Sequence, residues 1–212
     1  AERHVRLQGT VLHVKEQVTL TGSHASALRY YLSSEEPSER AELMATMMGG
    51  SRAGVSVTTL GAPDLEEPQR PLTLKIEYVV RGRFASAGGG IVGQLPSPWE
   101  HNFLSLRETE RRDSPLETRT PLVIESVTHF EVPSGQDIPE QDLAERSGTT
   151  DYAEWKLASR LADGVLTRDF RIQRAKGRYE ASRYPAYKDA MQAALGALEQ
   201  RVSLRGPASA AV

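Results

Sequence analysis

The sequence predicts a mainly β protein of the α+β class, with antiparallel sheets in a sandwich-like arrangement, one short helix in the first half and one C-terminal helix. Apolar and polar residues alternate over Leu72–Val80, as in a strand with one face in a core and the other in water. Shorter runs of the same kind follow one another near the start of the chain. Asp163-Gly164 separates two alternating runs, and this dipeptide favours a type I′ hairpin turn.

Composition excludes several classes of function. Hydrophobic residues make up 39% of the 212 residues, which is enough for a sizeable core. The 26 Lys and Arg residues nearly balance the 28 Asp and Glu residues, so we expect no strong attraction to nucleic acid or anionic lipid. The chain has no cysteine, which excludes thiol nucleophiles, disulfides, zinc–thiolate sites and iron–sulfur sites. No apolar run approaches the ~20 residues of a membrane span, so we expect no membrane insertion.

The first half is expected to form one β-rich domain over residues 1–110, with strands separated by turns at Gly9 and Gly22. We interpret residues 28–32 as one of these strands. A helix over about residues 36–48 is predicted after N-cap candidates Ser33 and Ser34, and its apolar stripe indicates core packing rather than a binding face. Leu43, Met44, Met47 and Met48 form that stripe.

The second half is expected to form a smaller β domain over residues 111–205. The boundary is placed near residue 110 because residues 95–121 are rich in proline and charge and show no periodicity. A strand is predicted at residues 122–132. A C-terminal helix is predicted at about residues 185–202 from apolar residues at three- and four-residue steps, and residues 206–212 are expected to be a disordered tail.

The turn at Asp163-Gly164 fixes the register of its hairpin. Counting outward from the turn places Leu161 opposite Leu166, Leu157 opposite Phe170 and Trp155 opposite Ile172, all on one face. The same count places Ser159 opposite Arg168, and we expect this polar pair where the buried face emerges at an edge.

The motifs that usually indicate catalysis or cofactor binding do not occur in the sequence. The five histidines form neither H-x-x-x-H nor H-E-x-x-H, and no G-x-S-x-G is present. The run Ser86–Gly90 lacks the Lys-Ser/Thr of a phosphate-binding loop, so we interpret it as a loop between strands. The sequence therefore predicts no catalytic, cofactor-binding or metal-binding residue and no cofactor.

Candidate contacts with a partner or ligand lie in the long irregular stretch. Trp99, His101 and Phe103 follow two prolines, and Arg107 and Arg111 follow in a charged run. Aromatic residues on a loop can stack on sugars or anchor a protein interface. They can equally pack onto the sheet beneath, and the burial energy of large aromatic side chains favours that alternative.

Several short motifs resemble the C-terminal region of bacterial transglutaminase-like proteins, in which a papain-like core is flanked by β-rich domains of unknown function. In the first half, Gly22, Ala25 and Arg29 precede the 43–48 segment and the strand that begins at Pro71. The second half carries the larger set: Arg111-Arg112-x-x-Pro115-Leu116, Pro121–Glu125, Val132–Gly135, Arg183–Tyr187 and Arg201–Leu204. The resemblance covers nearly the whole chain and implies a C-terminal accessory segment of an exported, envelope-associated protein.

The missing cysteine separates this chain from the chemistry of that family, because the catalytic cysteine has no counterpart here. We therefore expect a non-catalytic interaction module that scaffolds or docks a protein partner or an upstream catalytic core. One alternative is a carbohydrate- or cell-envelope-binding β domain that uses residues such as Trp99. A weaker alternative is a hydrolase that uses Ser or His with a carboxylate. The resemblance implies a periplasmic or envelope location, and the sequence leaves a cytoplasmic one open.

Overall fold

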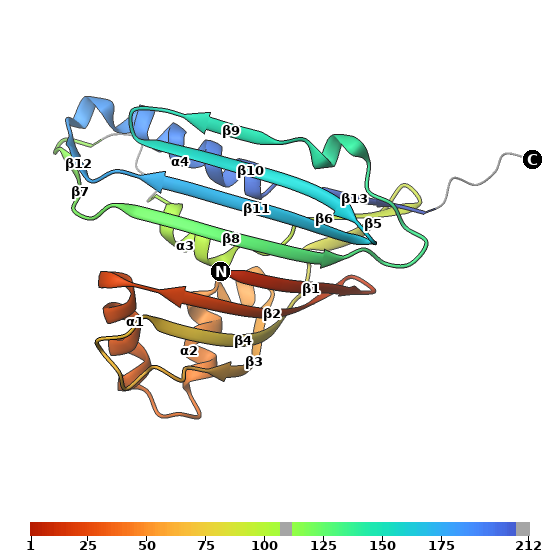
Figure 1. Ribbon diagram of the computed structural model, residues 1–212, viewed down its shortest axis with the longest axis horizontal. Helices are drawn as coiled ribbons and strands as arrows, with labels where there is room; N and C mark the ends of the chain where they lie inside the picture. Colours follow the sequence, from red (N-terminus) through yellow and green to blue (C-terminus); the bar gives the residue numbers. More distant parts are fainter. Residues whose placement is uncertain (107–111, 207–212) are drawn as a thin grey trace, which may run out of the picture.

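The computed structural model describes residues 1–106 and 112–206 and is mainly β, which confirms the predicted fold class (Figure 1). Its main element is an eight-stranded sheet in the order β3-β4-β2-β1-β8-β11-β10-β9. These strands span, in sheet order, Val55–Gly61, Leu72–Val80, Val11–Leu20, Glu2–Gln8, Leu122–Glu131, Val165–Arg174, Ala153–Ala162 and Arg146–Thr149.

Within the described residues, two smaller sheets and four α-helices complete the fold. The three-stranded sheet has the order β13-β6-β5 (Val202–Arg205, Gly90–Gly93, Phe84–Ala87), and the two-stranded one pairs β12 with β7 (Gly177–Tyr179, Leu116–Thr118). The helices are α1 (Gly22–Ser34), α2 (Arg40–Met47), α3 (Pro98–Leu104) and α4 (Tyr184–Leu198). Short 3₁₀ turns lie at Gly50–Ala53, Glu140–Leu143 and Ala181–Arg183.

The two halves of the chain share the large sheet. Strand β1 pairs in parallel with β8, whereas the other pairings of this sheet are antiparallel. Backbone hydrogen bonds therefore join the first half of the chain to the second. The domain boundary expected near residue 110 falls outside the described residues, and so does the expected tail from residue 207 onward.

The large sheet has one covered face and one open face. The four α-helices lie behind it in Figure 1, and the strands alternate between buried and exposed residues, as period-2 patterning requires. The covered face packs into two hydrophobic clusters. One contains mainly side chains from β1 to β4, α1 and α2; the other contains side chains from β8, β10, β11 and α4.

The hairpin at Asp163-Gly164 has the predicted register throughout. Both turn residues have positive φ, at 52° and 73°, as a type I′ turn requires. Trp155 pairs with Ile172 and Leu157 with Phe170, and their side chains are buried. The expectation that Arg168 would emerge at an edge is wrong, because this side chain is only 4% exposed.

The strand predicted at residues 28–32 is also wrong, since these residues belong to helix α1. The adjacent β-formers Tyr30 and Tyr31 suggested a strand. The buried residues nevertheless recur at helical spacing, at Ala25, Leu28, Arg29 and Leu32. Ser33 and Ser34 consequently end α1 instead of capping the next helix, and α2 begins at Arg40.

Two further boundaries differ from the prediction. Helix α4 ends at Leu198, and Val202 begins strand β13 rather than completing the helix. The stretch expected to be irregular contains helix α3, with Pro98 in its first turn. The Gly-rich run forms the expected connection between strands, since Gly88 and Gly89 join β5 to β6.

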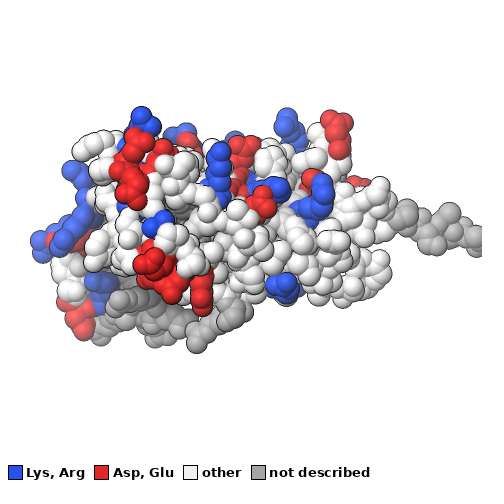
Figure 2. Space-filling view, turned by 90° about the horizontal axis from the view of Figure 1, so that it is seen from below, with Lys and Arg blue, Asp and Glu red and all other residues white. Residues whose placement is uncertain are grey.

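The charged side chains are of mixed sign on the face shown in Figure 2, where Lys and Arg lie among Asp and Glu. This agrees with the near balance of charge in the sequence. Among the described helices, none is long and apolar enough to cross a bilayer.

Candidate functional site

Helix α3 brings together the three aromatic and histidine residues that the sequence selected. Trp99, His101 and Phe103 all lie on its seven residues. Trp99 is 3% exposed and packs against the first hydrophobic cluster, whereas the His101 side chain is 59% exposed. Arg107 and Arg111, the other two candidate contacts, lie outside the described residues.

A buried ion pair fastens α3 to the large sheet. The Arg3 guanidinium on β1 donates from Nη1 and Nη2 to the two carboxylate oxygens of Glu100 on α3, at 2.9 and 2.7 Å. Both side chains are almost fully buried. A bidentate pair fixes orientation as well as distance, so α3 is held in one position by a residue of its own first turn.

Three strand residues extend this pair into a network. Arg3 Nε donates to Glu16 Oε1 on β2 at 2.6 Å, and the Tyr78 hydroxyl on β4 donates to Glu16 Oε2 at 2.8 Å. Glu100 also accepts a hydrogen bond from Ser126 on β8. The network thus joins α3 to four neighbouring strands of the sheet.

The two carboxyl groups of the network have opposite pKa shifts. Burial raises the pKa of Glu16, and the nearby Arg3 only partly offsets it. Burial alone would also raise the pKa of Glu100, but Coulombic attraction and hydrogen bonds from Arg3 hold it below its usual value. Burial and the charge of Glu16 raise the pKa of Tyr78, so its hydroxyl remains a donor. Arg3, the cation of this network, is therefore matched mainly to Glu100.

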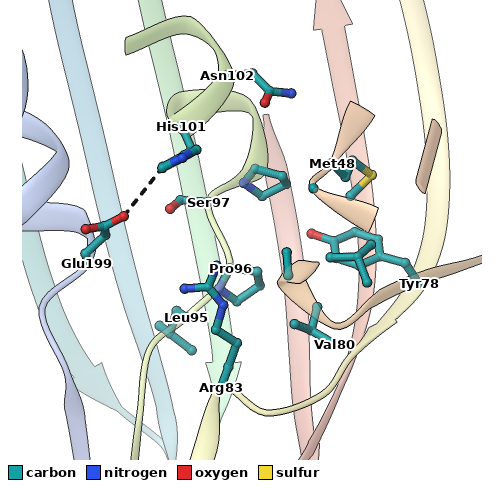
Figure 3. Close-up of a pocket in the computed structure, with 14 residues that line it drawn as sticks. Met48, Tyr78, Val80, Arg83, Leu95, Pro96, Ser97, His101, Asn102 and Glu199 are labelled. Atoms are coloured by element: carbon teal, nitrogen blue, oxygen red, sulfur yellow. Dashed lines mark ion pairs between the residues drawn. The ribbon is translucent and has the colours of Figure 1, made fainter. Parts of the chain in front are cut away.

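A cleft of about 290 Å³ opens on one side of α3 (Figure 3). Its walls come from α3, the segment before it, β3, β4 and the end of α2. The apolar lining includes Met48, Val80 and Leu95, and the hydrogen-bonding groups include Tyr78, Arg83 and Asn102. A concave site with a few converging polar groups is the usual form of a small-ligand site.

The edge of this cleft carries a histidine–carboxylate pair. His101 Nδ1 lies 3.5 Å from Glu199 Oε1, and Ser97 lines the same cleft. These are the residue types that the weaker hydrolase alternative requires. Among the described hydrogen bonds, however, none joins the Ser97 hydroxyl to His101, and a nucleophile needs that contact with its base.

An aromatic groove of about 350 Å³ lies on the other side of α3, against α1. Its lining contains no Asp, Glu, Lys or Arg: Leu20, His24, Ala27, Leu28, Tyr31, Met47, Trp99, Asn102 and Phe103. His24 meets Phe103 edge to face at 4.6 Å, and burial lowers the pKa of His24, which favours the neutral ring. We call this the α1–α3 groove.

Two exposed tyrosines lie on α1 beside the α1–α3 groove. Tyr30 is 73% exposed and Tyr31 52% exposed, and their rings meet edge to face at 5.8 Å. Tyr31 itself lines the groove. Exposed aromatic side chains beside an apolar hollow are typical of protein interfaces.

The residues of the network that holds α3 were not among the predicted site residues, although the sequence pattern indicates two of them. Arg3 lies in the same period-2 phase as Val5, and Glu16 lies in the same phase as Val14 and Val18. A turn near Gly9 places Arg3 directly opposite Glu16. Glu100 had no such signal, because it comes from a short helix almost a hundred residues away.

A separate group of side chains meets on the open face of the sheet. Glu2 and His4 on β1 lie beside His129 on β8, with Glu2 Oε1 3.5 Å from His4 Nε2 and 3.6 Å from His129 Nε2. The spacings H-x-x-x-H and H-E-x-x-H describe histidines on a helix, so they do not detect a cluster on strands. Residues at i and i+2 share a face on a strand, so Glu2-x-His4 was the available signal.

No family model matches this sequence, and comparison with curated proteins and with solved structures finds no similar chain. The resemblance to transglutaminase-like proteins therefore stays a prediction.

Proposed function

We propose that this chain is a non-catalytic interaction module that docks a protein partner in the α1–α3 groove, as an accessory part of a transglutaminase-like protein. The observation that carries the proposal is the pair of exposed tyrosines beside an uncharged aromatic groove. Tyrosine contributes a large apolar surface and a hydroxyl, which explains its enrichment at protein interfaces.

The chemistry of the groove defines the segment that it accepts. Because the lining has no charged side chain and His24 favours the neutral form, a charged residue would lose its hydration without gaining an ion pair. The volume accommodates one or two side chains rather than a whole helix. We therefore expect a partner segment that inserts an uncharged apolar anchor next to Tyr31 and contacts Tyr30 outside the groove.

The anchored helix supports this function. Trp99 and Phe103 form one wall of the groove, and the Arg3–Glu100 pair holds the helix that carries them. Asn102 Nδ2 further donates to the Met47 carbonyl at 2.7 Å and ties α3 to the end of α2. A groove with fixed walls loses little entropy when it binds.

Peptide phage display against the purified protein tests the proposal. The selected peptides should share an uncharged apolar residue and should bind Tyr31→Ala at least ~10-fold more weakly than wild type, as expected for an interface anchor. Val123→Ala is the matched control, because Val123 has the same 52% exposure but lies on β8. The proposal fails if no peptides are enriched, or if both variants bind them as wild type does.

The carbohydrate alternative is favoured by the same two exposed tyrosines, whose ring faces could stack on sugars. Trp99, the residue first considered for stacking, is buried. A glycan array probed with wild type and Tyr30→Ala distinguishes the two candidates. Binding of a glycan that Tyr30→Ala loses, without any peptide selection, would favour the carbohydrate function.

A further inference from the structure

The geometry points to a binding site for a divalent transition-metal ion, with Zn²⁺ as its natural occupant, formed by Glu2, His4 and His129 on the open face of the sheet. One ligand atom from each residue lies within 4.8 Å of the other two. Two imidazoles and one carboxylate are a ligand set that zinc uses in proteins. This site lies on the other face from the helices and is independent of the α1–α3 groove.

The strand register creates this cluster. His4 and His129 are paired residues of the parallel β1–β8 pair, so their side chains leave the sheet next to each other. Their rings are stacked, with centroids 4.8 Å apart and an interplanar angle of 20°. Glu2 precedes His4 by two residues on the same strand and therefore shares its face.

The distances are close to those of a coordinated metal. Ligand atoms in a tetrahedral zinc site lie about 3.3 Å apart, given zinc–nitrogen bonds of about 2.0–2.1 Å. The carboxylate oxygen of Glu2 lies 3.5 and 3.6 Å from the two imidazole nitrogens. Small side-chain rotations of Glu2 and His4, which are exposed, complete the set and leave a fourth position toward solvent.

His129 has a partner that orients its ring. Its Nδ1 lies 3.3 Å from the hydroxyl of Thr167 on the neighbouring strand β11. When Nδ1–H donates to this hydroxyl, Nε2 keeps its lone pair and faces Glu2. A hydrogen bond of this kind on the far nitrogen is a regular feature of metal-bound histidine.

Two neighbouring cations, Lys15 and Arg6, are matched to other carboxylates. Lys15, opposite His4 on β2, lies 3.0 Å from Glu77. Arg6, two residues beyond His4, donates to both carboxylate oxygens of Glu131, at 2.7 and 3.2 Å. Glu2 therefore remains available to the two histidines and to a cation bound between them.

A bound ion would connect the two halves of the sheet. Glu2 and His4 belong to the first half and His129 to the second, and the parallel β1–β8 pair is where the halves meet. Zn²⁺ should therefore raise the melting temperature by about 5–10 °C at a free concentration ~100-fold above its Kd, because it binds only the folded chain tightly.

Calorimetric titration of Zn²⁺ into protein without a histidine tag tests the site. We expect one ion per chain, at least ~10-fold weaker binding by His4→Ala and by His129→Ala, and about 10–100-fold weaker binding by Thr167→Val. His13→Ala is the matched control, since His13 is an exposed strand histidine on the same face of β2. This variant should bind Zn²⁺ as wild type does.

The melting temperature without metal reports whether each variant is folded, so lost binding cannot be confused with lost structure. The site is disproved if wild type binds Zn²⁺ no better than His4→Ala and His129→Ala, or if His13→Ala weakens binding equally. Neither outcome bears on peptide docking, which depends on the opposite face.

Discussion

Arg3 and Glu100 are 97 positions apart in the sequence, yet they form a bidentate ion pair that is almost fully buried. The pair joins β1 to α3 and so holds against the sheet the helix that carries Trp99, His101 and Phe103. Both hollows beside α3 have walls from this helix. The positions of the cleft and of the α1–α3 groove therefore depend on a contact that is itself inaccessible to solvent.

Replacing Arg3 by Met should lower the free energy of unfolding by about 3–5 kcal/mol, because Glu16 and Glu100 would remain buried without their cation. Urea denaturation measures this loss. Arg6→Met is the control, since Arg6 lies on the same strand and forms a similar pair with Glu131, but in solvent. Equal losses in both variants would contradict a special role for the buried pair.

Glu16→Gln should change how stability depends on pH. Because folding raises the pKa of Glu16, its contribution is fully favourable below the unfolded value of about 4.5 and is lost as pH rises through the folded pKa. The glutamine of the variant does not ionise, so the variant does not lose stability in this way as pH rises. Its free energy of unfolding should therefore increase relative to wild type as pH rises above about 4.5.

Glu100→Gln should show the opposite trend, because the pKa of Glu100 is lowered by folding. Its contribution is present above about 4.5 and is lost as pH falls through the folded pKa. Urea titrations of both variants at pH values below and above 4.5 measure the two slopes. Slopes of the same sign would contradict the assignment of the buried cation to Glu100.

Gly54→Ala should be far more destabilising than Gly9→Ala. Both glycines have positive φ, at 68° and 62°, so both substitutions strain the backbone by about 1–2 kcal/mol. At Gly54 the new Cβ would also lie 2.1 Å from the Arg81 carbonyl oxygen, whereas at Gly9 nothing lies within 4 Å. We expect a loss of about 3 kcal/mol or more at Gly54, measured by thermal unfolding. Similar losses would show that φ alone matters.

Arg168→Met should leave stability unchanged or raise it by up to about 2 kcal/mol. Burial lowers the pKa of Arg168 to about 10, and its Nε and Nη2 lack hydrogen-bond partners among the described residues. Since the pKa is lowered by folding, the charged form costs stability at any pH below that value. Chemical denaturation measures the effect. Arg171→Met is the control, because Arg171 is an exposed arginine on the same strand. A clear loss at position 168 would contradict it.

Local sequence patterns predicted the structural features that depend on residues close together in the sequence, such as turns and hairpin register. The Asp163-Gly164 turn and the alternation of its strands specify the same register, and the structure has that register throughout. Residues 28–32 show the opposite case, because tyrosines with high β propensity lie on a helix whose apolar stripe packs on the sheet. Tertiary packing outweighs propensity there.

Contacts between distant segments could not be predicted. The β1–β8 pairing brings His4 to His129, and the Arg3–Glu100 pair places α3 on the sheet; both join residues about a hundred positions apart. Neither a turn nor a periodic pattern specifies such pairings. The sequence therefore identified Trp99, His101 and Phe103 as candidates without indicating which would be buried.

The parallel pairing of β1 with β8 also has a consequence for folding during synthesis. β8 is made roughly 120 residues after β1, which corresponds to roughly 6–24 s at ordinary translation rates. Until then β1 can pair only with β2, and its other edge stays unpaired. Such an edge invites wrong pairing, so aggregation of nascent chains should concentrate in the interval before β8 emerges from the ribosome.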